Sequence, residues 1–202
     1  MKHVLVMGIN SQIGQAFFKL CQQEKNDQLQ FNFIEEEKDI PANELQKVQG
    51  IALQNAQQLA PLLQRTDILV INVTGWDIDY ILDAVMDAIE THNIQLEKIV
   101  FRSVAGVNDE YPLEEIKAVT HDQDEFIKQQ QYAGKLVDES EIPYTILRPT
   151  NMRNSDQLSY QLIEEGKTMK DAQDVSVDAI AQVLSKAISG NQFKNQSIGI
   201  CG

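Results

Sequence analysis

The stretch HVLVMGINSQIG, residues 3–14, decides the fold of this chain. Residues 4–7 form an apolar run of strand length that ends at Gly8, and residues 12–23 carry apolar side chains at helical spacing, with Gly14 among them. Small residues at such a corner let a pyrophosphate approach the backbone, while the helix offers free N–H groups and a positive dipole end. The stretch therefore predicts the phosphate-binding turn of a dinucleotide-binding domain, and an ordinary strand-to-helix corner is the alternative.

The turn departs from the usual glycine pattern at its middle position, where Ser11 stands. The Ser11 hydroxyl can donate a hydrogen bond to a phosphate, although its Cβ narrows the approach. At Gly14 the missing side chain allows close packing of helix and strand. The predicted cofactor contacts are Gly8, Asn10, Ser11, Gln12, Ile13 and Gly14, together with Thr74 and Gly75 after a later strand.

An acidic residue follows the second predicted strand, which covers residues 31–34. Glu35 lies at the distance from the turn at which a carboxylate accepts hydrogen bonds from the adenosine ribose hydroxyls. Glu36 and Glu37 follow it, so a 2′-phosphate would meet three carboxylates. This pattern predicts NAD(H) in preference to NADP(H), and the alternative is a solvated acidic loop.

Outward from the turn, strand and helix patterns alternate over the whole chain. The expected strands are 4–7, 31–34, 50–53, 67–72, 98–101, 144–147 and 197–200, and the expected helices are 12–23, 56–63, 77–92, 122–140, 156–165 and 176–189. Asn55 and Ser176 are the expected N-caps of two of these helices. The alternation predicts an α/β fold, a doubly wound and mostly parallel sheet of the dinucleotide-binding type. We expect one domain over residues 1–202, in which residues 150–175 form a small C-terminal lobe beside an open cleft.

Bulk composition excludes several classes of function. The 202 residues carry a formal net charge of −13, which disfavours binding to nucleic acid. No apolar run has the length of a membrane span, and the start of the chain does not resemble a signal peptide, so we expect a cytoplasmic protein without membrane partners. The two cysteines, Cys21 and Cys201, have no metal-ligand spacing, and we expect neither a metal site nor a disulfide.

Several segments together resemble a known family. GINSQIG (residues 8–14), NVTG (72–75), IVFRS (99–103) and VSVDAIA (175–181) are similar to motifs of the atypical short-chain dehydrogenase/reductase proteins, the NmrA-like NAD(P)-binding group. SEIPYTILRP, residues 140–149, resembles the family signature SGLxYTILRP and is the most specific match. The resemblance implies a Rossmann-type sheet with a dinucleotide at its carboxyl edge.

The departures from the family matter as much as the matches. Glu35 stands where the family commonly has an arginine that favours NADP, and Ala52 stands where it commonly has an aspartate near the adenine. Ser11 in the turn is the third departure, and each of the three removes one expected cofactor contact. A weakened or lost nucleotide site therefore stays open as an alternative.

Catalysis in short-chain dehydrogenases uses a tyrosine that donates a proton, a lysine four residues later and a serine that polarises the substrate. Ser103 matches the serine position at the end of a strand. The nearest tyrosine–lysine pair is Tyr132 and Lys135, which are three residues apart. These three residues are the catalytic candidates, and the alternative is that Tyr132 packs and Lys135 is solvated.

Four further side chains have open interpretations. His121 lies where a substrate pocket could form, or is simply exposed. Arg102 can face the cleft or cover a sheet face, and Trp76 can form a wall of the cleft or pack on the next helix. Arg148 is expected to anchor backbone at the end of its strand.

Two functions follow from these patterns. The first is dinucleotide binding with weak or no catalysis, as in a redox sensor or regulatory module with a small-molecule or protein partner. The second is an NAD(P)-dependent oxidoreductase that reduces a small carbonyl or quinone-like substrate. A relic without nucleotide binding is the third alternative.

Overall fold

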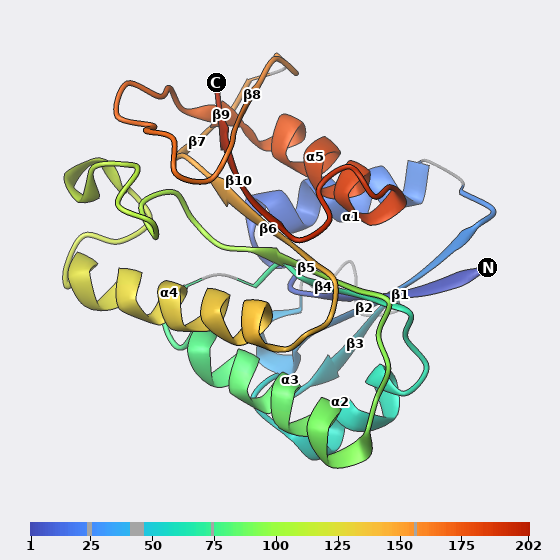
Figure 1. Cartoon of the computed structure of the whole chain (residues 1–202). Helices are drawn as coiled ribbons and strands as arrows, with labels where there is room; N and C mark the ends of the chain where they lie inside the picture. The colour runs from blue at the N-terminus through green and yellow to red at the C-terminus, as the bar shows by residue number, and fades with distance from the viewer. Residues whose placement is uncertain (24–25, 41–46, 74, 156) are drawn as a thin grey trace.

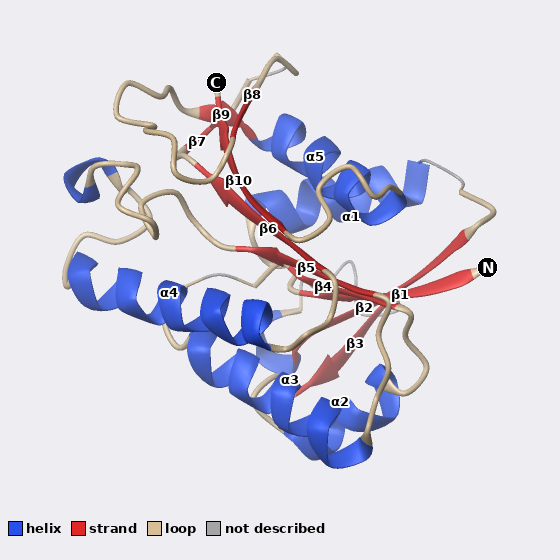
Figure 2. Ribbon diagram, viewed as in Figure 1, coloured by secondary structure: helices blue, strands red, loops and turns tan. Residues whose placement is uncertain are grey.

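The computed structural model describes residues 1–23, 26–40, 47–73, 75–155 and 157–202. Over these residues the chain forms an eight-stranded sheet with helices on both faces (Figures 1 and 2). The sheet strands are β1 (Lys2–Met7), β2 (Leu29–Glu36), β3 (Val48–Ile51), β4 (Ile68–Ile71), β5 (Lys98–Arg102), β6 (Tyr144–Pro149), β8 (Gln161–Ile163) and β10 (Gln196–Cys201). The helices are α1 (Gln12–Gln23), α2 (Ala56–Leu63), α3 (Ile78–His92), α4 (Gln123–Glu139) and α5 (Val177–Ser189). Short elements complete the fold: the 3₁₀ turns η1 (Glu37–Asp39) and η2 (Leu113–Glu115), and the strand pair β7 (Met152–Arg153) and β9 (Val175–Ser176).

The strand order determines where along the sheet a ligand can bind. The order is β3-β2-β1-β4-β5-β6-β10-β8, and every neighbouring pair is parallel except β10 with β8. The chain winds from β1 towards β3 in one direction and from β4 towards β10 in the other. This reversal opens a crevice at the carboxyl ends of β1 and β4, the place where doubly wound sheets bind ligands. The predicted fold class is confirmed.

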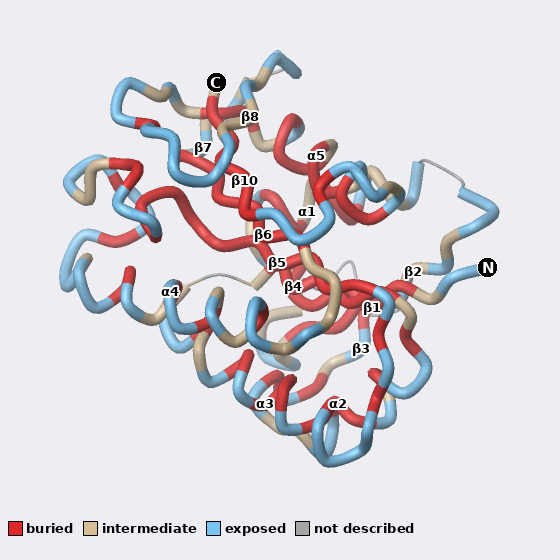
Figure 3. The backbone as a smooth tube through the Cα atoms, in the orientation of Figure 1, coloured by how far each residue is buried: buried red, intermediate tan, exposed pale blue. Residues whose placement is uncertain are grey.

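Two apolar layers enclose the sheet. Helices α1 and α5 cover one face, and α2, α3 and α4 cover the other (Figure 1). The central strands are buried on both faces, which explains their continuous apolar sequences (Figure 3). Within the described segments, no helix is both long enough and apolar enough to span a bilayer.

Both expected N-caps are confirmed. The Asn55 side chain accepts hydrogen bonds from the backbone N–H groups of Gln57 and Gln58 at the start of α2. Ser176 Oγ accepts one from Ala179 N at the start of α5, at 3.2 Å. Each cap satisfies amide groups that the helix itself leaves unpaired.

The helix expected over residues 156–165 is wrong. Its described residues are irregular, except for β8, which pairs antiparallel with β10 at the edge of the sheet. The apolar side chains that suggested a helix pack instead against sheet and helix: Tyr160 and Leu162 join the layer under α1 and α5. A partner strand far away in the sequence thus overrides the local helical pattern.

Candidate nucleotide site

The turn between β1 and α1 requires glycine at both predicted positions. Gly8 has φ +90°, and a Cβ there would lie 2.7 Å from atoms of Val73. A Cβ on Gly14 would lie 2.7 Å from the Ile9 backbone. The absence of these two side chains lets the backbone of the turn, β4 and the start of α1 approach one another closely.

Ser11 caps the helix that follows the turn. Its Oγ accepts a hydrogen bond from Gly14 N at 3.0 Å, and the Gln15 side chain donates to Ile9 O at 2.8 Å. The first residues of α1, Gln12 and Ile13, line a hollow on the crevice side of the turn. The helix N-terminus is thus held with its positive end at the crevice.

Glu35 bonds directly to the turn. One carboxylate oxygen accepts from Ile9 N at 2.8 Å and from Asn10 N at 2.9 Å, while the other accepts from Glu36 N at 3.0 Å. The side chain is buried, with 5% of its surface exposed. The carboxylate therefore stabilises the turn from the end of β2, a role that its position in the sequence did not indicate.

An acidic hollow of about 290 Å³ adjoins this carboxylate. It lies between the turn and the end of β2, and Glu35, Glu36 and Asp39 line it together with Asn10 and Ser11. Glu36 also accepts a hydrogen bond from Leu53 N at 2.7 Å, so its carboxylate is held in place. An anionic group that enters this hollow meets three carboxylates.

A second hollow, of about 200 Å³, lies on the opposite side of the turn. Its walls come from the start of α1, from the segments after β5 and β6, and from Tyr111 and Ile116. The two hollows flank the same turn, and both include residues that the sequence predicted as cofactor contacts. The turn and the start of α1 therefore contribute residues to two separate hollows.

Arg102, at the end of β5, lines the second hollow and is 2% exposed. Its guanidinium donates to Asn72 Oδ1, to the Asn72 carbonyl and, at 3.4 Å, to Ser11 Oγ. Burial lowers the pKa of the guanidinium to about 10. Asn72 in turn donates to Gly8 O at 2.8 Å, so Arg102 contacts the turn both directly and through Asn72.

Ser103 is buried beside α4, but its partner is not a tyrosine. Its hydroxyl donates to Gln130 Oε1 at 3.3 Å, and Gln130 Nε2 donates to Gly75 O at 3.0 Å. Gln130 has no exposed surface. The structure thus connects Ser103 with the predicted contact Gly75 through an uncharged amide.

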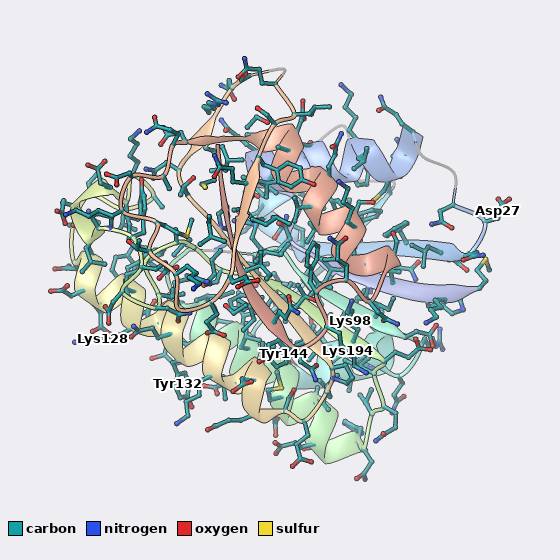
Figure 4. All side chains as sticks on the ribbon, turned by 45° about the horizontal axis from the view of Figure 1, so that its top comes forward. Asp27, Lys98, Lys128, Tyr132, Tyr144 and Lys194 are labelled. Atoms are coloured by element: carbon teal, nitrogen blue, oxygen red, sulfur yellow. The ribbon has the colours of Figure 1, made fainter. Side chains whose placement is uncertain are left out.

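The inner side of α4 next to Ser103 carries Phe126 and Gln130, four residues apart. Tyr132 is 47% exposed and points away from the sheet (Figure 4). Lys135 is exposed too, with its Nζ 3.7 Å from the Glu139 carboxylate. The structure does not bring Tyr132 or Lys135 together with Ser103.

Trp76 and Arg148, which the sequence left open, make packing and anchoring contacts in the structure. Trp76 stacks on His121 with ring centroids 5.7 Å apart and meets the edge of Phe126, so it packs on the segment before α4 and on α4 itself. Arg148 donates to Ser197 Oγ and forms a buried ion pair with Glu110, which is structural anchoring as expected. Thr74 lies outside the described residues.

The sequence interpretation missed Gln130, Tyr111 and Asn72. Gln130 lies in the helix predicted over residues 122–140, and Tyr111 lies in the polar segment before it, which the sequence predicts as a loop with a short helical piece. Residue 130 belongs to the same helix face as the apolar Phe126 and Ala133, which was the available signal for its burial. Among the described residues, no three His, Cys, Asp or Glu side chains come together in a way that could hold a metal ion.

Comparison with known proteins identifies one matching family and several solved structures with the same fold. A sequence model of a family described as NAD(P)H-binding matches residues 8–191. A short-chain dehydrogenase/reductase from Veillonella parvula, crystallised with NADP, superposes with a TM-score of 0.81 at 19% identity, covering 100% of this chain and 94% of that one.

Two more solved structures share the fold. A Rossmann-fold NAD(P)-binding family protein from Shigella flexneri has a TM-score of 0.75 at 20% identity, with 99% and 93% of the two chains covered. ChuY, an anaerobillin reductase from Escherichia coli O157:H7, has a TM-score of 0.78 at 13% identity, with 98% and 96% covered. No curated protein matches the sequence.

Proposed function

Because this chain belongs to the NAD(P)H-binding family, we propose that it binds a dinucleotide across the turn between β1 and α1 as a redox sensor or regulatory module. The proposal excludes the tyrosine–lysine proton transfer of short-chain dehydrogenases. The observation that carries the proposal of binding without catalysis is the contact between the Ser103 hydroxyl and the Gln130 amide. An amide at that place can orient a ligand, but it cannot supply a proton to a hydride acceptor.

We place the adenosine of the dinucleotide at the acidic hollow, and the carboxylates that line this hollow support a preference for NAD(H) over NADP(H). A 2′-phosphate there would meet Glu35, Glu36 and Asp39, whereas two ribose hydroxyls can donate hydrogen bonds to the same oxygens. The Glu35 carboxylate is already engaged with the turn, so Glu36 and Asp39 are the more available acceptors.

Thermal unfolding with NAD, NADH, NADP and NADPH in turn tests both parts of the proposal. A ligand at 100 times its dissociation constant stabilises the folded state by about 2.7 kcal/mol. We expect a shift with NAD or NADH, a smaller one with the phosphorylated forms, and no NADH consumption across a panel of carbonyls and quinones. No shift with any of the four overturns the proposal.

A matched pair of variants locates the binding. Ser11→Asp keeps a good helix cap but places a negative charge at the phosphate position, so we expect it to abolish the ligand-induced shift. Ser11→Asn also caps well and stays neutral, and we expect it to retain most of the shift. Equal shifts in unfolding temperature in both variants would mean that the nucleotide binds elsewhere than at this turn.

The alternative function, reduction of a small carbonyl or quinone-like substrate, is favoured by Tyr111. This side chain lines the hollow beside Gln12 and Ile13. Its hydroxyl accepts a hydrogen bond from Asn151 Nδ2 at 3.0 Å, so its own hydrogen stays available for donation. Burial, followed by the charges of Asp174 and Glu115, raises the pKa of Tyr111 and keeps the phenol protonated. Turnover of NADH that falls about 100-fold in Tyr111→Phe would establish this function instead.

A further inference from the structure

Two arginines of this protein are buried at the carboxyl ends of neighbouring strands, and they differ in whether a carboxylate lies beside the guanidinium. Arg148, on β6, forms an ion pair with Glu110, whose side chain is 3% exposed. Arg102, on β5, has no carboxylate within ion-pair distance among the described residues. Its partners are the amide of Asn72, a carbonyl and the Ser11 hydroxyl, all of which are uncharged.

A buried cation without a counter-charge is expensive for a folded protein. Desolvation by burial lowers the pKa of Arg102, and among the described residues no carboxylate opposes this effect. The hydrogen bonds from Nε and Nη2 leave Nη1 without an acceptor among the described residues. The fold thus keeps one positive charge, with donor capacity left over, at the edge of the sheet.

The location of this charge identifies the class of ligand. Arg102 lines the same hollow as Gln12 and Ile13, the first residues of α1. The helix dipole adds positive potential at that point, which disfavours the guanidinium charge as long as no anion is present. Both groups favour one anion, placed next to Ser11.

We propose that Arg102 provides the counter-charge for the diphosphate of the bound dinucleotide. This inference rests on the proposed function and adds to it a residue outside the glycine turn. A guanidinium can donate two parallel hydrogen bonds to phosphate oxygens, and in a buried site such charged hydrogen bonds are strong. Nucleotide binding then compensates a charge that the empty protein leaves uncompensated.

The test compares a ligand that contains the diphosphate with one that lacks it. Dissociation constants for ADP-ribose and adenosine are measured by ligand-observed NMR titration with the full chain. In Arg102→Gln, which retains hydrogen bonding to Asn72, we expect ADP-ribose binding to weaken about 10- to 100-fold. Adenosine binding should change less than about twofold. Arg102→Lys, which keeps the charge, should recover part of the lost affinity.

The control is Arg65→Met, which removes an exposed positive charge far from the turn and should leave both affinities unchanged. Equal weakening of ADP-ribose and adenosine in Arg102→Gln would mean that Arg102 only maintains the shape of the site. Unchanged ADP-ribose binding would mean that the arginine does not touch the ligand. Either result overturns the inference while the proposed function stands, whereas a wild-type protein that binds neither NADH nor ADP-ribose overturns both.

A second measurement needs no ligand and still applies if Arg102→Gln does not fold. Ser11→Asp places a carboxylate beside the guanidinium, so we expect the unliganded protein to melt at a higher temperature than Ser11→Asn. The dipole of α1 also favours a carboxylate at this position, and Asn55→Asp against the wild type, at the N-cap of α2, measures that effect alone. If the difference between the Ser11 variants is no larger than this control, the inference fails. Where Arg102→Gln does fold, its background should reduce the difference to that of the control.

Discussion

At the scale of single residues, Gly14 shows how little space the nucleotide turn contains. Alanine has a higher helix propensity than glycine by about 1 kcal/mol, so Gly14→Ala would stabilise an isolated helix. Here the added Cβ would meet the Ile9 backbone at 2.7 Å, and backbone cannot move away cheaply. We expect a net loss of about 1–3 kcal/mol in the free energy of unfolding, measured by urea denaturation.

Gly134 provides the matched control for that experiment. It lies in α4, and the atom nearest to a Cβ added there would be Ile146 Cδ1 at 3.9 Å, which is ordinary contact. Gly134→Ala should therefore leave stability unchanged or raise it by up to about 1 kcal/mol. A similar loss in both variants would contradict the steric explanation.

Glu35 combines a structural and an electrostatic role. In Glu35→Gln, the charged acceptor of three backbone N–H groups becomes a neutral amide, and we expect about 1–3 kcal/mol less stability. If the ribose of the cofactor lies in the acidic hollow, as proposed, removal of one negative charge beside it should also raise the affinity for NADPH relative to NADH by roughly fivefold.

Calorimetric titration with NADPH and NADH gives this ratio directly. Glu90→Gln, an exposed change near the end of α3, removes the same charge elsewhere and should not alter the ratio. A ratio that stays constant in Glu35→Gln would exclude the carboxylate from cofactor choice.

At the scale of elements, local sequence predicts most helices and strands but not the ones made by distant partners. The strand β4, residues 68–71, is buried on both faces, so its continuous apolar run is enough to predict a strand. The strands β7, β8 and β9 are two or three residues long and exist through pairing with other segments. No periodicity can develop over such lengths, and the local pattern predicts a helix where β8 lies.

The cap of α5 can be tested as an element. Ser176 Oγ accepts from Ala179 N and donates to Gln157 O at 2.6 Å. Ser176→Ala removes both bonds, and we expect the free energy of unfolding to fall by about 1–2 kcal/mol. Ser189→Ala, at the other end of α5 on the exposed side, should change it little.

The contact between α4 and β6 makes stability depend on pH in alkaline solution. Burial first, and then the hydrogen bond to Asp138, raises the pKa of Tyr144 from 10.0 to about 12 (Figure 4). The folded state therefore retains a proton that the unfolded chain loses above pH 10. Its stabilising effect is complete below pH 10 and disappears as the pH rises through 12.

We expect this component of the alkaline transition to be absent in Tyr144→Phe. Unfolding by urea at several pH values between about 9 and 12 measures it, since stability in this range follows the difference in bound protons. Tyr80→Phe changes an exposed tyrosine on α3 and is the control. Identical slopes in the wild type and Tyr144→Phe would show that the phenol has no part in the transition.

At the scale of the whole molecule, the ion pair between Arg148 and Glu110 joins the long segment after β5 to the sheet. The Glu110 carbonyl also accepts from Met169 N at 2.7 Å, so the same residue holds the segment after β8. Glu110→Ala leaves the Arg148 charge buried without a partner, and we expect a loss of about 3–5 kcal/mol.

A double-mutant cycle distinguishes this charge effect from lost packing. The variant that combines Glu110→Leu with Arg148→Met removes both charges, and it should be clearly more stable than Glu110→Leu alone, which leaves the Arg148 charge buried without a partner. If the double variant is no better, packing at residue 110 rather than charge explains the loss.

The candidate site shows the same limit of prediction at the largest scale. The glycines and Ser11 can be identified because a phosphate turn is local in sequence, and Gly8 and Ser11 do line the acidic hollow. Gln130 and Tyr111 reach their places only after the chain has crossed the sheet. The helix face that Gln130 shares with Phe126 indicates its burial, but not its contact with Ser103. The direction of Arg102 stays open in the sequence, because the face of a strand end depends on register with its neighbours.

The position of β10 has a consequence for synthesis in the cell. This strand inserts between β6 and β8, although β6 precedes it by the entire stretch from Pro149 to Gln196. While the ribosome still makes that stretch, a nascent chain that has assembled β1 to β6 carries an open, apolar sheet border without its neighbour. Until β10 emerges, this border is liable to aggregate, and a chaperone would be expected to shield it.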